Sequence, residues 1–120
     1  MNQLSFEREL RLLTPNHFNH VFSQSLRVGS PYITFVFRKN DIDHPRLGFA
    51  IAKKQVKRAH ERNRLKRVVR EDFRLKQKQI PAVDIVVMAR TAAVALDNKE
   101  IRTILDKLWQ RLLSIQQNKS

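Results

Sequence analysis

The side chains best suited to chemistry in this sequence are basic ones gathered in the middle of the chain. Residues 53–78 hold twelve of the 24 lysines and arginines and three of the eleven acidic residues, so this segment carries +9 of the total formal charge of +13. Its densest part reads Arg62-Asn63-Arg64-Leu65-Lys66-Arg67, with Arg70 and Arg74 following. Arginine offers paired donors that fit two phosphate oxygens, and lysine offers a mobile point charge. The segment therefore predicts binding to a polyanion, above all to nucleic acid.

A helix must position these basic residues, because apolar residues interrupt them at helical intervals. One face of that helix would hold Leu65, Val68, Val69 and Phe73. At about 100° per residue, an adjacent stripe would hold Asn63, Lys66, Arg67, Arg70 and Arg74. A solvated face with ion pairs such as Arg67 with Glu71 is the alternative, but it leaves most of the positive charge without partners. The excess of charge favours nucleic-acid binding.

The histidines and acids give weaker signals. His17 and His20 are spaced as a metal pair on a helix, but no carboxylate or third histidine stands in an obvious ligand position. A metal-independent ribonuclease that uses His17 or His60 is chemically feasible, although no spacing supports it. The acids, Asp72 and Asp84 among them, are scattered and are expected in turns, caps and charge balance. We therefore assign no catalytic residue and no metal ligand.

The remaining elements favour an α/β (α+β) two-layer sandwich in the order α-β-β-β-α-β-α, with a small mixed sheet of about four strands and three helices. Thr14 and Pro15 predict the start of a first helix that ends near Gln24. Strands are expected at residues 26–29, 32–37, 47–52 and 84–90. The strands at 32–37 and 47–52 are expected to pair as a hairpin. The continuous apolar run of 84–90 predicts a central strand.

The last helix has a clear start signal and a clear apolar face. Asp97 followed by Glu100 is a capping-box pattern. The apolar stripe that follows consists of Ile101, Ile104, Leu105, Leu108, Trp109, Leu112 and Leu113. In the first helix, Phe18 and Phe22 are four residues apart and share a face. The pattern favours core packing for both, and a platform for stacked single-stranded bases is the alternative.

Composition limits the class of protein. The 120 residues predict a single domain over 1–120, and its charge does not distinguish RNA from DNA as the ligand. Without cysteine, disulfides and thiolate metal sites are excluded. No apolar run approaches the roughly 18 residues of a membrane span. These features predict a cytoplasmic protein with no membrane partner.

Four stretches closely resemble the protein component of bacterial ribonuclease P. They are Phe18-x-x-Val21-Phe22, Arg46-Leu47-Gly48-Phe49-Ala50-Ile51-Ala52-Lys53-Lys54, Arg58-Ala59-His60-Glu61-Arg62-Asn63-Arg64-Leu65-Lys66-Arg67 and Met88-Ala89-Arg90. The resemblance runs from about Leu10 to Leu113 and defines the expected core of the domain. It implies a non-catalytic protein subunit of an enzyme that removes the 5′ leader of precursor tRNA by endonucleolytic hydrolysis. The RNA subunit would carry the active site and its Mg²⁺ ions.

The resemblance also implies two binding surfaces. The residues matching the surface for the catalytic RNA subunit are Arg62, Asn63, Arg64, Lys66, Arg67 and Arg70. The residues matching a cleft for the leader of precursor tRNA are Phe18, Phe22, Lys53 and Arg90. A further cleft position falls on Phe35 or Val36 and stays open. A left-handed strand–helix–strand crossover is implied around the basic helix, and no obligate protein partner is expected. The alternative is a structural RNA-binding protein of ribosomal or RNA-chaperone type.

Overall fold

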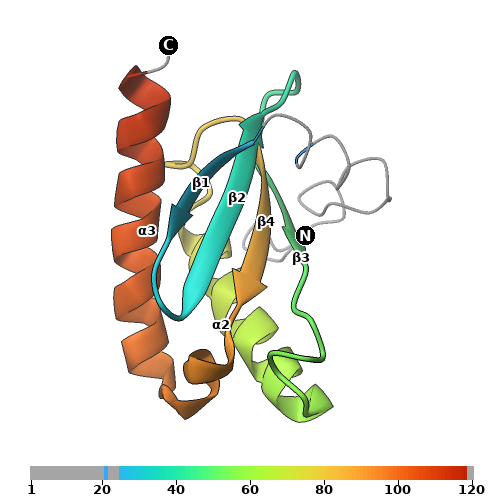
Figure 1. Cartoon of the computed structure of the whole chain (residues 1–120). Coiled ribbons are helices and arrows are strands. Elements are labelled where there is room, and N and C mark those ends of the chain that lie inside the picture. The colour runs from blue at the N-terminus through green and yellow to red at the C-terminus, as the bar shows by residue number, and fades with distance from the viewer. Residues whose placement is uncertain (1–20, 22–24, 119–120) are drawn as a thin grey trace, which may run out of the picture.

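A four-stranded sheet with two long helices on one of its faces makes up most of the structure (Figure 1). This computed structural model describes Val21 and residues 25–118. The strands are β1 (Leu26–Gly29), β2 (Ile33–Lys39), β3 (Arg46–Phe49) and β4 (Val83–Ala89). The helices are α2 (Ala59–Lys76), the 3₁₀ helix η2 (Thr91–Ala95) and α3 (Asn98–Asn118). The mixed α+β class is confirmed, whereas the first expected helix lies, apart from Val21, outside the described residues.

The strands lie in the order β1-β2-β4-β3. β2 pairs antiparallel with β1 and β4, and β3 pairs parallel with β4. The expected hairpin between residues 32–37 and 47–52 is therefore wrong, because β4 lies between the two strands. Six of the seven β4 residues are buried, so this apolar strand is best placed with a neighbour on each side. The central position expected for it is confirmed.

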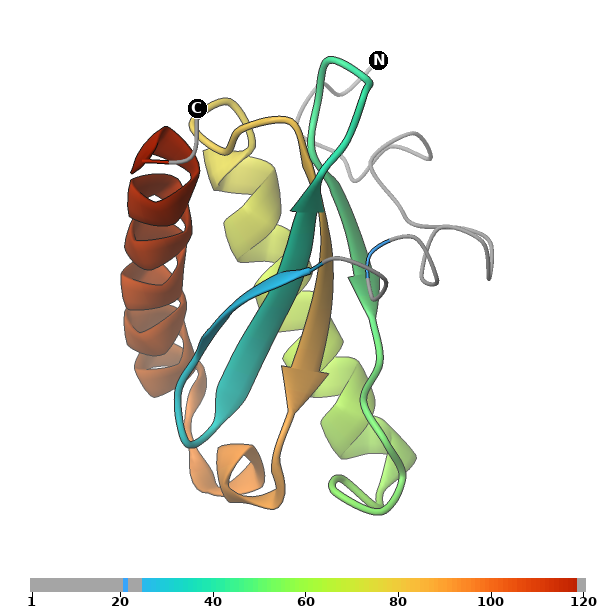
Figure 2. The ribbon, with the colours of Figure 1, turned by 45° about the horizontal axis from the view of Figure 1, so that its top comes forward.

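The main core lies between the sheet and the two helices, which cover the same face (Figure 2). The four apolar residues expected on one face of α2 are all buried: Leu65, Val68, Val69 and Phe73. From α3, Trp109 places its ring 4.4 Å from that of Phe35, centroid to centroid. The indole Nε1 of Trp109 also donates a hydrogen bond of 2.7 Å to Asp72, a buried acid that joins α2 to α3.

The capping box of α3 is confirmed. The backbone N–H of Glu100 donates to Oδ1 of Asp97 at 2.8 Å, and the backbone N–H of Asp97 donates to Oε1 of Glu100 at 3.0 Å. Two backbone donors that the first turn of a helix cannot pair internally are thus satisfied. This fixes the start of α3 directly after η2.

A second, smaller apolar cluster lies on the opposite face of the sheet. It consists of Val36 from β2, Val86 from β4 and Val21, each with no exposed surface. Side chains alternate between the two faces of a strand, so neighbours of Phe35 and Ile85 point away from the helices. Val21 therefore covers the centre of the face that α2 and α3 leave open.

A buried ion pair also lies on this second face. Arg46 of β3 donates to both carboxylate oxygens of Asp84, at 2.8 Å from Nε and 2.7 Å from a terminal nitrogen. Asn40 donates to the same carboxylate at 3.0 Å. Asp84 has no exposed surface, and these contacts join the β2–β3 connection to the middle of the sheet. Asp72 and Asp84 balance charge as expected, because they pair with Lys76 and Arg46, but they are buried within α2 and β4 and do not lie in turns or caps.

Candidate nucleic-acid interface

The exposed stripe of α2 presents part of the expected basic surface to solvent. Asn63 and Arg67 are exposed, and Lys66 is half-buried. Among the residues that the structure describes, none forms a hydrogen bond or ion pair with these three side chains. Glu71, the expected partner of Arg67, instead lies 3.6 Å from the guanidinium of Arg102 in α3. The alternative of a solvated helix face with an Arg67–Glu71 ion pair therefore does not hold, because Glu71 does not neutralise Arg67.

Arg70 extends this stripe towards the edge of the sheet. Its guanidinium carbon lies 5.2 Å from the ring centroid of Phe49, the last residue of β3. This cation–π geometry holds the charge near the edge strand without burying it. The basic stripe of α2 and the end of β3 thus form one continuous surface.

Arg62 is directed at the protein itself. One of its terminal nitrogens donates to the backbone carbonyls of Val56 and Lys57, both at 2.9 Å. These carbonyls belong to the turn that leads from β3 into α2. Arg62 therefore holds that turn against the first turns of the helix.

Arg64 makes its contacts on the other side of α2, towards η2 and α3. It donates to the side-chain oxygen of Asn98 at 2.9 Å and to the backbone carbonyl of Val94 at 3.2 Å. It also lies 3.6 Å from the carboxylate of Glu61. These contacts join α2 to η2 and to the start of α3. Sequence reasoning assigned Arg62 and Arg64 to the RNA surface and missed their hydrogen bonds, because the acceptors of these bonds lie outside α2.

The described residues of the expected leader cleft lie near one end of the sheet. Lys53 follows β3 and Arg90 follows β4, and the carboxyl ends of parallel strands meet at the same edge. Both side chains are exposed. The turn after β3 is joined to η2 by Gln55, whose side-chain oxygen accepts from the backbone N–H and the hydroxyl of Thr91 at 3.1 and 3.2 Å. Phe18 and Phe22 lie outside the described residues.

Phe35 and Val36, between which the sequence leaves the further cleft position open, point to opposite faces of the sheet, and both are fully buried. Phe35 is fully buried against Trp109 on the side of the helices, so it lines no cleft on the other face. Val36 lies on that other face in contact with Val21 and Val86. Val36 exposes no surface there, because Val21 covers it.

Other kinds of site have little support in the described part of the chain. Within Val21 and residues 25–118, no three histidine or acidic side chains come together in a group suited to a metal ion. His17 and His20 fall outside those residues. None of the helices in the described part combines the length and apolar character that a bilayer crossing requires.

The family model and the related sequences that match this chain belong to one family. The family model for ribonuclease P matches residues 6–113. The ribonuclease P protein component of Photobacterium profundum is 57% identical over 112 residues, which cover 93% of this chain and 95% of the relative. That of Haemophilus influenzae is 54% identical over 117 residues, which cover 98% of each chain.

Solved structures share the fold. The RNase P protein of Thermotoga maritima matches with a TM-score of 0.75 at 35% identity, covering 84% of this chain and 96% of the other. The RNase P protein of Staphylococcus aureus matches with a TM-score of 0.79 at 29% identity, covering 84% of this chain and 93% of the other. Both similarities extend over most of the two chains compared.

Proposed function

This chain belongs to the ribonuclease P protein family and acts as the protein subunit of that tRNA-processing enzyme, and from this premise we propose how its surfaces divide the work. The exposed stripe of α2 binds the catalytic RNA subunit through Asn63, Lys66, Arg67 and Arg70. Arg62 and Arg64 belong to the same surface but act mainly by fixing the elements beside it. One observation carries this assignment. Lys66 and Arg67 have no described partner that neutralises their charge, whereas the neighbouring Arg62 and Arg64 are already hydrogen-bonded to the protein.

The second surface binds the 5′ leader of precursor tRNA. Lys53 and Arg90 supply exposed cations at one edge of the sheet, beside the face on which Val36 is buried under Val21. Phe18 and Phe22 flank Val21 in the sequence, and Val21 covers that face. Cations that follow a backbone, combined with surfaces on which bases rest, bind single strands with little regard to sequence. A leader-binding surface of this kind favours precursor over mature tRNA, because only the precursor has a leader.

The chemistry of hydrolysis then belongs to the RNA subunit. We assign no catalytic side chain to the protein, and we assign the Mg²⁺ ions to the RNA. The protein contributes binding free energy and neutralises phosphates, which lowers the ionic strength that the folded RNA needs. We further propose that residues 1–120 act as one RNA-binding domain in the cytoplasm, without an obligate protein partner, and that the β3–α2–β4 crossover is left-handed as the resemblance implies.

Reconstitution tests this function. Purified protein alone should leave precursor tRNA intact, and protein added to the RNA subunit at low Mg²⁺ concentration should restore cleavage at the leader junction. The control is the RNA subunit alone at the same Mg²⁺ concentration. Cleavage by the protein without RNA would contradict the assignment of catalysis to the RNA subunit. Replacement of all four histidines, with activity kept in the reconstituted enzyme, would separately exclude a histidine-based ribonuclease.

A further inference from the structure

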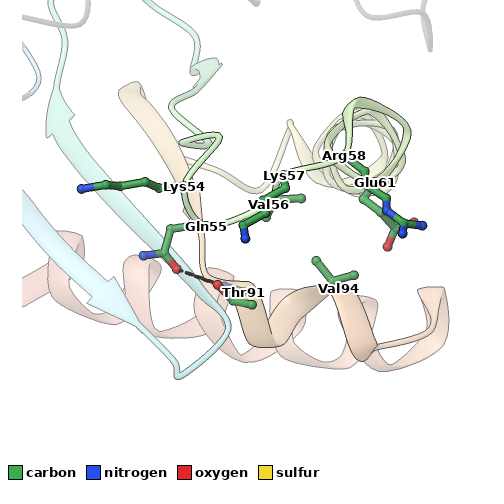
Figure 3. A pocket seen from close by; sticks show the side chains of 8 residues that line it. All are labelled: Lys54, Gln55, Val56, Lys57, Arg58, Glu61, Thr91 and Val94. Carbon is green, nitrogen blue, oxygen red and sulfur yellow. Dashed lines mark hydrogen bonds between the residues drawn. The ribbon is translucent and has the colours of Figure 1, made fainter.

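A cavity of about 460 Å³ lies beside the basic stripe, between the turn after β3, the first turn of α2 and η2 (Figure 3). Pockets of this size are typical of small-molecule and cofactor sites. The side chains around it come from two segments of the chain, residues 54–61 and η2: Lys54, Gln55, Val56, Lys57, Arg58, Glu61, Thr91 and Val94. The cavity is therefore formed by the tertiary fold rather than by one loop.

The lining of this cavity combines an apolar part with an excess of positive charge. Val94, which is half-buried, supplies the accessible apolar part, and Val56 lies opposite it, almost fully buried in the core. Lys54, Lys57 and Arg58 are exposed and, within the described residues, their side chains have no hydrogen-bonded or ion-paired partner. Glu61 is the one acidic residue in the lining, and it already lies close to Arg64. An anionic ligand with a flat apolar part matches this combination.

The walls of the cavity are held in place by bonds already described. Arg62 binds the carbonyls of Val56 and Lys57 in one wall, and Arg64 binds the carbonyl of Val94 in the other. Gln55 and Thr91 connect the two walls through two hydrogen bonds, one of which is drawn in Figure 3. A backbone held by such contacts keeps the walls of the site preorganised, which reduces the entropy lost on binding. The two arginines of the Arg-Asn-Arg string thus shape the cavity and do not fill it.

We propose that this cavity receives one unpaired nucleotide of the RNA bound by the protein. The base would rest on Val94, and its phosphate would lie against Lys57 and Arg58. Bases extruded from a helix or loop are the parts of an RNA that proteins read from pockets of this kind. Such a site presupposes the RNA-binding function proposed above and adds to it a defined contact, distinct from the open stripe of Asn63 and Arg67.

Nuclear magnetic resonance of the full chain tests the site directly. Adenosine 5′-monophosphate should shift the backbone amide signals of Gln55, Thr91 and Val94, whereas inorganic phosphate at the same concentration should leave Val94 unshifted. Equal shifts with inorganic phosphate would reduce the cavity to a simple anion site and overturn the proposal. Shifts by the nucleotide that avoid these residues would overturn it too.

Two variants connect the cavity to RNA binding. Val94→Phe fills the cavity without changing any charge, and Lys57→Met removes one cation while keeping the length of the side chain. Each should weaken nucleotide binding severalfold, Val94→Phe by excluding the base and Lys57→Met by removing a charge that faces the phosphate. Each should also weaken binding to the RNA subunit. Lys107→Met removes an equally exposed lysine from α3 and should change neither.

The outcomes separate this proposal from the function on which it depends. If the unaltered protein does not bind the RNA subunit, the proposed function fails. If it binds, and Val94→Phe and Lys57→Met bind as tightly as the unaltered protein, only the nucleotide site is excluded. Circular dichroism shows whether Val94→Phe folds, and if it does not, Lys57→Met decides.

Discussion

Arg62 and Arg64 direct their guanidinium groups at carbonyl and amide oxygens of the protein, whereas Arg67 has no such partner among the described residues. Three arginines from one basic string therefore have different roles. The string and its helical spacing predict a charged stripe, but they cannot show which members bond to turns and helices elsewhere in the chain. That division follows from tertiary contacts over five to 34 residues of separation.

Exchanging Arg67 and Arg64 for alanine should separate the two roles. Arg67→Ala should lower the slope of log Kd against log salt for the RNA subunit by about 1, because one phosphate contact is lost. Its melting temperature should stay unchanged. Arg64→Ala should instead cost about 1 to 2 kcal/mol of folding free energy, because two hydrogen bonds from a charged donor are removed. Filter binding over a salt series and thermal denaturation measure the two effects, and an unchanged slope for Arg67→Ala would mark that residue as a solvated charge.

The buried ion pair of Arg46 and Asp84 contributes to the stability of the fold in a way that can be measured. The hydrogen bonds to Asp84 raise the pKa of the Arg46 guanidinium above its ordinary value. A raised pKa means that the stabilising contribution is fully present below the unfolded-state value, and so across the whole physiological pH range. Nothing in the sequence pairs these two residues, because 38 positions separate them.

Replacing Arg46 by methionine should destabilise the fold strongly. The change leaves the carboxylate of Asp84 buried, with Asn40 as its described partner, and should cost about 3 kcal/mol. Urea denaturation measures the loss. The double variant Arg46→Met with Asp84→Asn should lose less than the sum of the single variants, because the pair is coupled. Additive losses would show that the ion pair contributes nothing beyond its separate parts.

Among the helices and strands, the sequence predicts correctly the features that depend on a few neighbouring residues. It does not predict which strands pair when they are far apart in the chain. The Asp97–Glu100 cap and the buried faces of α2 and α3 depend on spacings of three and four residues, and the structure confirms them. The expected hairpin failed because nothing between residues 32 and 52 reveals that β4 inserts between the two strands. Loop sequences fix a hairpin only where a tight turn does so, and the β2–β3 connection contains no such turn signal.

The cap of α3 gives a test at this scale. Asp97→Ala should cost about 1 kcal/mol, because the backbone N–H of Glu100 loses its partner. The melting temperature should fall accordingly, and RNA binding at a temperature well below melting should be unchanged. Gln110→Ala, an exposed change in the same helix, is the matched control. Equal melting temperatures for both variants would show that the cap does not limit stability.

The whole molecule has two unlike faces. One face of the sheet is covered by α2 and α3, and the other carries the cluster of Val21, Val36 and Val86. The sequence predicts the class of fold and the basic helix, because charge and periodicity are local properties. It leaves open which face Phe35 and Val36 occupy, since a shift of one residue exchanges the faces of a strand. The register of β2 against β4 decides this point.

Phe18→Ala tests how the open face is used. We expect this change to weaken binding of the reconstituted enzyme to precursor tRNA more than to mature tRNA, because only the precursor carries a leader to stack. Competition binding with the two RNAs measures the ratio. Arg67→Ala, which concerns the RNA subunit, should weaken both about equally. Equal weakening by Phe18→Ala would instead place that ring in the core.

The central position of β4 also bears on how the chain is made. β2 and β3 both precede it, with the whole of α2 in between, yet neither can complete its pairing until β4 has left the ribosome. The whole basic helix therefore emerges while the sheet that must cover its apolar face is unfinished. A nascent chain at that stage carries its full cationic charge with no finished fold, and such exposed segments are prone to wrong associations. Synthesis of this protein thus passes through an interval in which any nearby RNA, including that of the ribosome, is a competing ligand.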